Sequence, residues 1–521
     1  MKHIVLRGIP GLSILILCGL TLACGGRFSD PQYQTVWVAK TTNPLVAQFS
    51  LQSPCAGTAY VEFGPDVSYG RSTATYPVPA GNSGIQILVA GMRASTTYHM
   101  RSQVQCNGSA LVSPDLMFQT GPLPAIAFPA LTVNRPDPSL SSTENPGIEM
   151  ITVPVAGTPA LFTDRDANPI WYYDVGQDFV FTSKLLPNGH IILTLINPSD
   201  SILREVDLAG NTVREMDIYS LTAKLKIIGS DIVPGGYHHD VLPLQNGHLL
   251  VLVNLSKDFT NLPGYPGTIA VQGDAVIDLD PNWNPVWTWN AFDYLDVNRH
   301  LNFLPDWTHS NALVYSPDDG NFLISMRHQS WVLKIDYNNG AGTGNVLWHL
   351  GYQGDFALTQ GGVPTDDPSV WFSFQHFPSL ITQSGSQTTL AILDNGDNRF
   401  LNTDGAECIS PGSGNSFPPC YSRATIFQVD ESAKVADLQW SDLQTGYGLW
   451  GGSINQLENG NVEFDLNDPV IPSAPNVASE VQEVSQTSTP QVIWTMEFPV
   501  PLYAYRAYRI PSLYTGVTWQ Y

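Results

Sequence analysis

Residues 185–193 read LLPNGHIIL, two apolar segments joined by an Asn-Gly turn. It returns as LPLQNGHLL at 242–250, as DGNFL at 319–323 and as LENGNV at 457–462. Asn-Gly between apolar segments is the strongest short hairpin signal, because the turn that it favours places both turn residues at positive φ. The sequence therefore predicts a hairpin that recurs along most of the chain.

A second hairpin usually follows the first. Its first strand ends in Asp and its second often ends in Trp, as in Ile277-Asp278 leading to Val286-Trp287. Two hairpins per unit give four antiparallel strands, which is the blade of a β-propeller. Six such units are present, with irregular spacing, and helical periodicity is nearly absent. We predict an all-β fold with a six-bladed β-propeller over residues 147–521; a β-sandwich with long insertions is the alternative.

A smaller domain precedes the propeller. Residues 36–121 alternate apolar and polar side chains at the strand period of two. The segment LVAGMRASTTY, which ends at Tyr98, resembles the tyrosine corner of fibronectin-type sandwiches, in which the Tyr hydroxyl bonds to upstream backbone. We expect a small fibronectin-like β-sandwich here, joined to the propeller by a Pro- and Ser-rich linker at 122–146.

The N-terminus has the pattern of a targeting segment. A basic start is followed by an apolar run, and the segment closes with LTLAC, which ends at Cys24. A small residue before Cys resembles a bacterial lipobox, so we predict a lipoprotein signal peptide at 1–24, a lipidated Cys24 and a tether at 25–35. A plain secretory signal is the alternative. Either way we expect an exported protein, periplasmic or at the cell surface, held to the membrane by its lipid.

Composition narrows the choice of partners. The chain has 521 residues, with 23 Lys and Arg against 46 Asp and Glu, for a net charge of −23. This balance lacks the basic footprint of a nucleic-acid-binding protein. An anionic substrate would therefore need a local cationic pocket against the overall field.

Four cysteines remain after the lipidation site. In an oxidising compartment an even number suggests disulfides, and order along the chain makes Cys55–Cys106 and Cys408–Cys420 the natural pairs. Four free buried thiols are the alternative. The CxxC spacing of a zinc site is missing.

Three histidines occur where blades open. His239, or its neighbour His238, precedes one hairpin, and His309 and His376 precede two others; Arg327 closes the second strand of the blade that begins near His309. First strands of successive blades start at one rim of a central channel. We therefore expect these side chains to surround one cavity.

Three imidazoles suit zinc or copper, but an adjacent arginine repels a cation. A tetrahedral oxyanion fits better, because Arg offers a planar fork to its oxygens and imidazole serves as nucleophile and as acid or base. Histidines that only satisfy loop backbone groups are the structural alternative.

These motifs resemble those of the bacterial arylsulfotransferases, exported enzymes that do not use the nucleotide sulfate donor. The resemblance covers nearly all of the expected mature chain and rests on YHHD at 237–240, DWTHSN at 306–311, RHQ at 327–329, QH at 375–376, DNGDNR at 394–399 and SRA at 422–424. It implies the following roles: His376 becomes transiently sulfated, His239, His309 and Arg327 are its partners, and Asn311 and Ser453 contact substrate.

The expected reaction is ping-pong transfer of a sulfuryl group from an aryl sulfate to a phenol. No cofactor and no metal are expected, the partners are small phenols and aryl sulfates, and a homodimer is possible. Two alternatives are kept: a propeller lipoprotein that binds a sulfated or anionic ligand without turnover, and an aryl sulfatase that lets water reach the intermediate.

Overall fold

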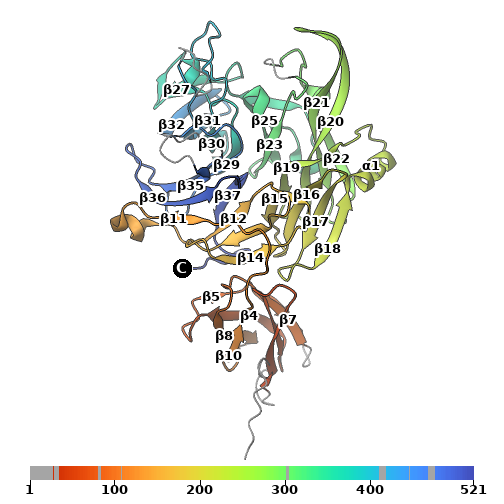
Figure 1. The fold of residues 1–521 in the computed structure, drawn as a ribbon. Coiled ribbons are helices and arrows are strands. Elements are labelled where there is room, and N and C mark those ends of the chain that lie inside the picture. The colour runs from red at the N-terminus through yellow and green to blue at the C-terminus, as the bar shows by residue number, and fades with distance from the viewer. Residues whose placement is uncertain are drawn as a thin grey trace, which may run out of the picture.

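A computed structural model describes residues 27–28, 35–79, 84–106, 108–300, 304–409, 418–444, 446–467 and 476–520. These residues form an all-β protein of many antiparallel sheets (Figure 1). The predicted signal peptide at 1–24, with Cys24, lies outside the described residues. In the part of the chain that the structure describes, no helix is long and apolar enough to cross a membrane.

Two sheets build the N-terminal part. One has the order β1 (Arg27–Phe28), β2 (Thr35–Lys40), β3 (Ala47–Gln52) and β7 (Gly84–Val89); the other runs β10 (Leu116–Gln119), β8 (Thr97–Cys106), β4 (Gly57–Gly64) and β5 (Arg71–Ser72), with β6 (Tyr76–Val78) on β4 and β9 (Ser109–Val112) on β8. Apolar side chains from both sheets share one core. The Tyr98 hydroxyl accepts a hydrogen bond from Arg93 N at 2.9 Å, as predicted for a tyrosine corner.

Six further sheets follow. In pairing order they are β14 (Pro169–Tyr173), β13 (Ala160–Thr163), β12 (Ile148–Thr152) and β37 (Arg506–Ile510); β15 (Phe179–Leu185), β16 (Ile191–Asn197), β17 (Asp200–Val206) and β18 (Thr212–Asp217); β19 (Gly236–Pro243), β20 (Leu249–Leu262), β21 (Tyr265–Leu279) and β22 (Pro285–Asn290); and β23 (Ser310–Ser316), β24 (Asn321–Met326), β25 (Trp331–Ile335) and β26 (Val346–Leu350).

The last two are larger. They are β29 (His376–Ser384), β30 (Gln387–Asp394), β31 (Arg423–Asp430), β32 (Val435–Leu443), β27 (Ala357–Gln360) and β28 (Val363–Pro364); and β33 (Ile454–Gln456), β34 (Val462–Asn467), β35 (Val477–Val484), β36 (Val492–Pro499) and β11 (Thr132–Asn134). The strand β11 lies in the proline-rich segment 122–146. The described helices are short: α1 (Ile218–Ile227), α2 (Ala291–Tyr294), η1 (Pro138–Thr143), η2 (Arg327–Gln329), η3 (Asn338–Gly340) and η4 (Pro368–Val370).

The predicted hairpins are present, but their turns differ from the prediction. The Asn-Gly and Asp-Gly segments join β15 to β16, β19 to β20, β23 to β24, and β33 to β34. Only the glycine takes positive φ, as at Gly189 (82°) and Gly247 (85°), and the preceding Asn does not. In the first turn Gly189 N donates to Leu186 O and Leu186 N donates to His190 O, so the loop is longer than the expected two residues.

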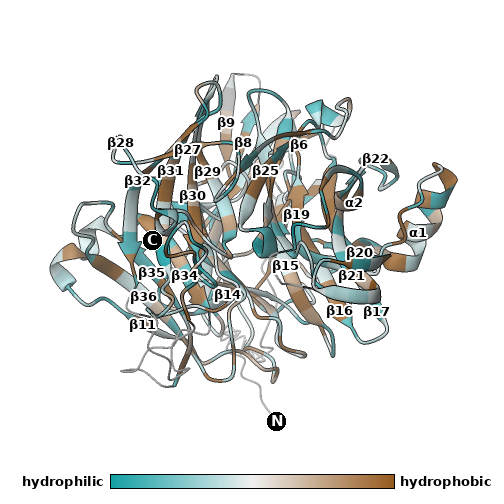
Figure 2. Ribbon diagram, turned by 90° about the horizontal axis from the view of Figure 1, so that it is seen from above, coloured by the Kyte–Doolittle hydropathy of each residue, from teal (hydrophilic) through white to brown (hydrophobic). Residues whose placement is uncertain are grey.

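The first strands of these sheets contact one another in succession. β15 contacts β19, β19 contacts β23, β23 contacts β29, β29 contacts β33 and β33 contacts β37, while β12, the partner of β37, contacts β15. The sheets are thus grouped about a shared centre, as Figure 2 shows from above. The N-terminal ends of β19, β23 and β29 lie on the same side of that centre.

The C-terminal segment contributes to the packing between the parts. β37 pairs with β12, which joins the end of the chain to the start of the six sheets. Beyond it, Trp519 is buried and its Nε1 donates to Ser72 O at 2.8 Å in the N-terminal sheets. Both predicted disulfides, Cys55–Cys106 and Cys408–Cys420, are formed.

Candidate active site

The predicted histidines stand at irregularities where inner strands begin. β19, β23 and β29 each have a shifted register near their first residues. There, His239 (φ 50°), His309 (φ 47°) and Phe377 (φ 43°) take left-handed conformations that side chains rarely adopt. Such strained residues cluster at functional sites, and bulges redirect side chains. The distortions at His239 and His309 bring these two imidazoles together.

The imidazole rings form a continuous row. The ring centroids of His239 and His309 are 4.8 Å apart, and those of His309 and His328 are 4.6 Å apart. His238 extends the row at the other end: its ring centroid lies 4.9 Å from that of His239, and its Nε2 lies 3.2 Å from the buried carboxylate of Asp274. Of the two adjacent histidines, His239 is the one whose ring contacts His309.

His376 occupies the first position of β29 and is 2 % exposed. Its Nδ1 lies 2.8 Å from Asn395 Oδ1, and its Nε2 accepts a hydrogen bond from Gly451 N at 3.2 Å. Burial, and then the charge of Arg327, hold the pKa of His376 well below the usual value for histidine. The ring is therefore neutral at physiological pH.

His239 is neutral for a similar reason. Burial is the largest cause that holds its pKa well below the usual value, and the neighbouring charges of His309 and His238 act in the same direction. A bound anion would reduce the electrostatic repulsion between these imidazoles in their protonated forms. At His239, negative charge is therefore favourable and an additional proton is not.

Arg327 provides the fixed positive charge. It begins η2, directly after β24. Its Nη2 donates to Asp397 Oδ2 at 2.7 Å and to Leu449 O at 3.0 Å, and its Nη1 lies 2.7 Å from His328 Nε2. Its guanidinium also lies 4.9 Å from the centroid of the Phe374 ring. These contacts fix the plane of the guanidinium.

Two partners of this arginine have shifted pKa values. Burial raises the pKa of Asp397 to about 6, although the charge of Arg327 and the bond from the Tyr447 hydroxyl act in the opposite direction. Burial, followed by the charges of His309 and Arg327, lowers the pKa of His328 to about 4. A neutral His328 accepts from Arg327 through Nε2 and donates from Nδ1 to Asp306 O at 2.7 Å.

His309 has an acidic partner. Its Nδ1 lies 2.6 Å from Asp306 Oδ2, and although burial acts to raise the pKa of Asp306, this bond and the charge of His309 lower it. A carboxylate at Nδ1 stabilises the imidazolium form, as in hydrolase triads. Ligand atoms of Asp306, His309 and His328 lie within 4.8 Å of one another, close enough for a metal ion, but Arg327 beside His328 disfavours a cation there.

Tyr505 closes a circuit of contacts around the site. Its ring centroid lies 5.5 Å from that of His239 and 6.3 Å from that of His376. From His239 the circuit continues along the row to Arg327, and then through the segment 449–451 back to His376. Burial is the largest cause that raises the pKa of Tyr505 to about 12, so its hydroxyl stays protonated.

The two predicted polar contacts lie on either side of His376. Asn311 Nδ2 donates to Gln375 O at 2.8 Å, and its buried Oδ1 has no hydrogen-bond partner among the residues that the structure describes. Ser453 is fully buried and its hydroxyl donates to Ala507 O at 2.6 Å. In this last segment it is Gly451, not Ser453, whose backbone contacts His376.

A second buried charge network lies beside the histidines. Arg506, at the start of β37, donates from Nη1 to Asp240 Oδ1 at 3.1 Å and from Nη2 to Asn311 O. Lys184 Nζ also reaches Asp240 Oδ1, at 2.6 Å. Two cations share one carboxylate, so this network adds positive potential near His239 and His376.

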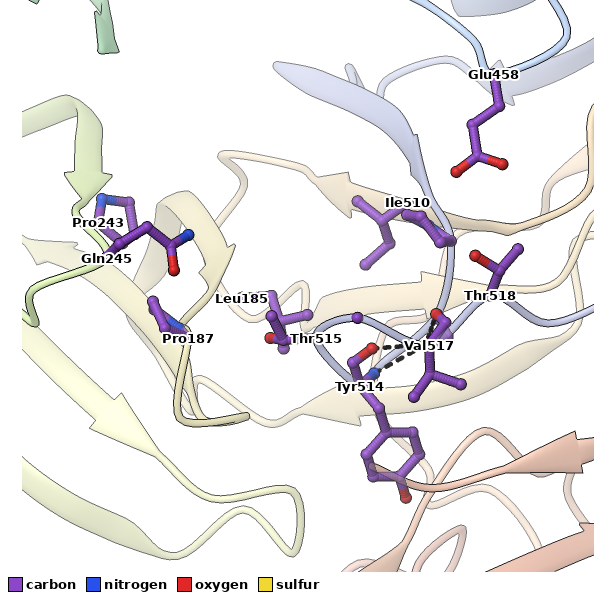
Figure 3. A pocket seen from close by; sticks show the side chains of 13 residues that line it. Leu185, Pro187, Pro243, Gln245, Glu458, Ile510, Tyr514, Thr515, Val517 and Thr518 are labelled. Carbon is purple, nitrogen blue, oxygen red and sulfur yellow. Dashed lines mark hydrogen bonds between the residues drawn. The ribbon is translucent and has the colours of Figure 1, made fainter. Parts of the chain in front are cut away.

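A cavity of about 450 Å³ lies at the opposite ends of the strands (Figure 3). Its lining includes Leu185, Pro243 and Ile510, the last residues of β15, β19 and β37, together with Tyr514 and Val517 of the C-terminal segment. It contains none of the predicted site residues. The cavity and the histidine row are therefore separate features.

Several of these residues have no role in the prediction made from the sequence. Asn395, Asp397 and His328 belong to motifs that the sequence displays, but their partners come from other sheets. Tyr505 carried no signal, because an aromatic residue before a strand is typical of core. Asp306 is three residues before His309, and that spacing was the one local signal for its pairing.

A buried neutral imidazole, an arginine and further histidines gathered at one place suit the binding of an oxyanion. A model of the family Arylsulfotransferase (ASST) matches residues 147–506, which include every residue of the circuit. The chain belongs to this family. It is therefore an enzyme, an arylsulfotransferase, and aryl sulfates and phenols are consistent substrates for it.

Other comparisons are distant. No curated protein matches the chain. Among solved structures, an ACO/RPE65 chimera is 11% identical with a TM-score of 0.32, covering 92% of this chain and 97% of that one. The dihydro-heme d1 dehydrogenase NirN is 10% identical (TM-score 0.30; 73% and 80% covered), and a DUF4221 family member from Bacteroides vulgatus is 7% identical (0.30; 74% and 98%). Likenesses at this level carry no argument.

Proposed function

We propose that this arylsulfotransferase takes a sulfuryl group from an aryl sulfate onto Nε2 of His376 and passes it to a phenol. The observation that supports this proposal most strongly is the state of His376: the ring is buried, its pKa is lowered, and its Nε2 accepts a hydrogen bond. A neutral imidazole with a lone pair on a defined nitrogen is the form that a nucleophile needs.

Each half-reaction moves one proton. First, the Nε2 lone pair attacks sulfur, the bond between sulfur and the aryl oxygen breaks, and the departing phenol takes a proton from His309. Then the oxygen of the second phenol attacks sulfur, the N–S bond breaks and His309 takes the proton back. The bond between His309 and Asp306 supports this role, because the carboxylate stabilises the protonated ring.

The remaining groups bind the sulfuryl oxygens. Arg327 supplies positive charge in a fixed plane, and His239 adds a ring nitrogen. Gly451 N points at His376 Nε2, the atom that becomes bonded to sulfur, and it is free to donate elsewhere once Nε2 has used its lone pair. Asn311 and Ser453 are proposed substrate contacts. The unsatisfied Oδ1 of Asn311 is an acceptor, so it supports a contact to a phenol hydroxyl and not to a sulfuryl oxygen.

The scaffold proposed for this reaction is a six-bladed β-propeller over 147–521, preceded by a fibronectin-like sandwich over 36–121. The succession of contacts among first strands and the pairing of β37 with β12 support the propeller. We also propose an exported lipoprotein lipidated at Cys24, which the two disulfides are consistent with. A homodimer remains part of the proposal.

Steady-state kinetics with 4-nitrophenyl sulfate and phenol test the mechanism. We expect parallel double-reciprocal lines, nitrophenol release that depends on phenol, and loss of turnover in His376→Ala. The matched control is His349→Ala, which removes a partly exposed histidine paired with Asp355 outside the circuit and leaves turnover unchanged. Release without phenol would instead identify a sulfatase, and binding without release would identify a non-catalytic binding protein.

A further inference from the structure

Asn395 lies directly behind the proposed nucleophile. It follows β30 and is fully buried. Its Nδ2 donates to Gly448 O at 2.9 Å and to Gly451 O at 3.1 Å, while its Oδ1 lies 2.8 Å from His376 Nδ1. The side chain therefore joins β29 to the glycine-rich segment of the next sheet.

The two carbonyls fix the orientation of the amide. An amide nitrogen donates and an amide oxygen accepts, so the atom that faces Gly448 O and Gly451 O must be Nδ2. The flipped amide would place three oxygens against one another and leave His376 Nδ1 facing an NH₂ group. Oδ1 must therefore accept a hydrogen bond from His376, and the proton of that bond is on Nδ1.

Gly451 gives the same answer at the other nitrogen. Its backbone N–H can only donate, so Nε2 of His376 is the unprotonated nitrogen. Gly451 takes φ 68°, and an added Cβ would lie 2.6 Å from Asn467 Nδ2, so the backbone can approach the ring only as glycine. The contacts at the two ring nitrogens thus select the same tautomer.

We propose that Asn395 is a positioning residue that holds the His376 proton on Nδ1, both in the resting enzyme and in the sulfated intermediate. The inference rests on the proposed function and deepens it. In the first half-reaction the proton fixed on Nδ1 leaves the lone pair on Nε2, the nitrogen that accepts from Gly451 N until the substrate binds. Asn395 also holds Gly451 through its carbonyl, so loss of Asn395 removes one contact to the ring and loosens the other. The ring can then carry its proton on Nε2, and that form cannot attack sulfur.

The same proton keeps the intermediate reactive. After attack, Nε2 carries SO₃⁻ and Nδ1 still carries its proton, so the ring is cationic and leaves as a neutral imidazole when the phenol attacks. If Nδ1 lost the proton, the leaving group would be an imidazolate, which is far poorer. An amide oxygen is too weak a base to take that proton, whereas a carboxylate at this place would share it and stabilise the adduct.

The surroundings hold Asn395 in place. The preceding Asp394 is fully buried and pairs with Arg423 at 2.6 Å and with Arg399 at 2.9 Å. Ser422 donates its hydroxyl to Asn395 O at 2.7 Å. The backbone is therefore fixed on both sides, and changing the Asn395 side chain changes the contact to His376 first.

The experiment combines tautomer and half-reaction measurements on the purified protein. Side-chain ¹⁵N NMR of histidine-labelled protein, with His376 assigned by its loss in His376→Ala, is expected to show a neutral ring protonated at Nδ1. In Asn395→Ala this signal moves to the Nε2-protonated form or an average. Single-turnover nitrophenol release then falls on the order of 10²- to 10⁴-fold, the range seen when a histidine loses the group that orients it.

Two further variants separate chemistry from folding. Asn395→Asp keeps an oxygen near Nδ1, but its second oxygen faces the carbonyls of Gly448 and Gly451, so its native fold is first verified by circular dichroism. We expect the folded variant to form the sulfated adduct but to discharge it to phenol at least tenfold more slowly than wild type. Asn467→Ala removes another fully buried Asn, next to the same glycine but away from His376, and both rates stay within threefold.

A wild-type His376 protonated at Nε2 would overturn the proposal, as would Asn395→Ala with unchanged tautomer and rate. Absence of sulfuryl transfer by wild type would overturn the proposed function instead, and the tautomer would still be measurable.

Discussion

Replacement of Arg327 by lysine tests whether the site needs a planar guanidinium or only a positive charge. The guanidinium reaches Asp397, Leu449 O and His328 at 2.7, 3.0 and 2.7 Å and lies against the Phe374 ring. A lysine ammonium has one nitrogen and cannot satisfy these directions together. Its charge would persist, but the donors would no longer be fixed where negative charge develops.

We expect Arg327→Lys to lower kcat/KM about 10²- to 10³-fold, or about 3–4 kcal/mol of transition-state stabilisation, which is the effect of losing one oriented donor. The measurement is initial nitrophenol release at saturating phenol. Activity within threefold of wild type would refute the claim that guanidinium geometry matters.

Arg327→Met gives the matching stability test. It leaves Asp397 buried without its cation, and breaking such a pair costs about 3–5 kcal/mol. The folded pKa of Asp397, about 6, exceeds its ordinary value of 3.8, so the stability that this carboxyl contributes is present at low pH and is lost as pH rises through 6. Without Arg327 the pKa rises further. The deficit relative to wild type should therefore be larger at pH 8 than at pH 5, by calorimetry; a deficit independent of pH would contradict this reasoning.

Three more predictions follow from single contacts. The lowered pKa of His376 keeps the nucleophile neutral, so the acid limb of kcat/KM should lie below pH 6.5; a limb above pH 7 assigned to His376 would be inconsistent with a buried neutral ring. Gly452→Ala should lose most activity and about 2–4 kcal/mol of stability, because Gly452 has φ 96° and an added Cβ would lie 2.3 Å from Asp465 O; normal turnover would show that the segment can shift. Trp519→Ala should cost about 3–5 kcal/mol in unfolding while leaving kcat unchanged at 25 °C, since Trp519 packs on the N-terminal sheets; a large fall in kcat would reveal coupling to the site.

Patterns of neighbouring residues in the sequence predicted more of the fold than of the site. The Asn-Gly hairpins and the strands ending in Asp were predictable because a turn is decided by a few adjacent residues. The predicted turn geometry was wrong at Gly189, because the loop is longer than two residues and only the glycine takes positive φ. The Tyr98 contact to Arg93 N was predictable for the same local reason, since five residues separate the two.

The site depends on contacts that no local pattern encodes. His239, His309 and His376 were expected to converge, and the rings of the first two do meet, at 4.8 Å. The hydrogen bond between His376 and Asn395 joins the start of β29 to the end of β30. The orientation of the Asn395 amide, and with it the position of the His376 proton, depends on two carbonyls more than 50 residues away in the sequence. Tyr505 directly precedes β37, near the C-terminal end of the chain. It reaches the site because β37 pairs with β12, about 350 residues earlier in the sequence.

The most direct test of the central claim is intact-protein mass after a brief reaction with 4-nitrophenyl sulfate and no acceptor. A covalent sulfohistidine adds one SO₃, about 80 Da, to wild type. We predict that this mass appears in wild type, maps to the peptide containing His376, is absent from His376→Ala, and disappears when phenol is added as phenyl sulfate forms. Nitrophenol release with unaltered mass, or an adduct on another residue, would contradict transfer through His376.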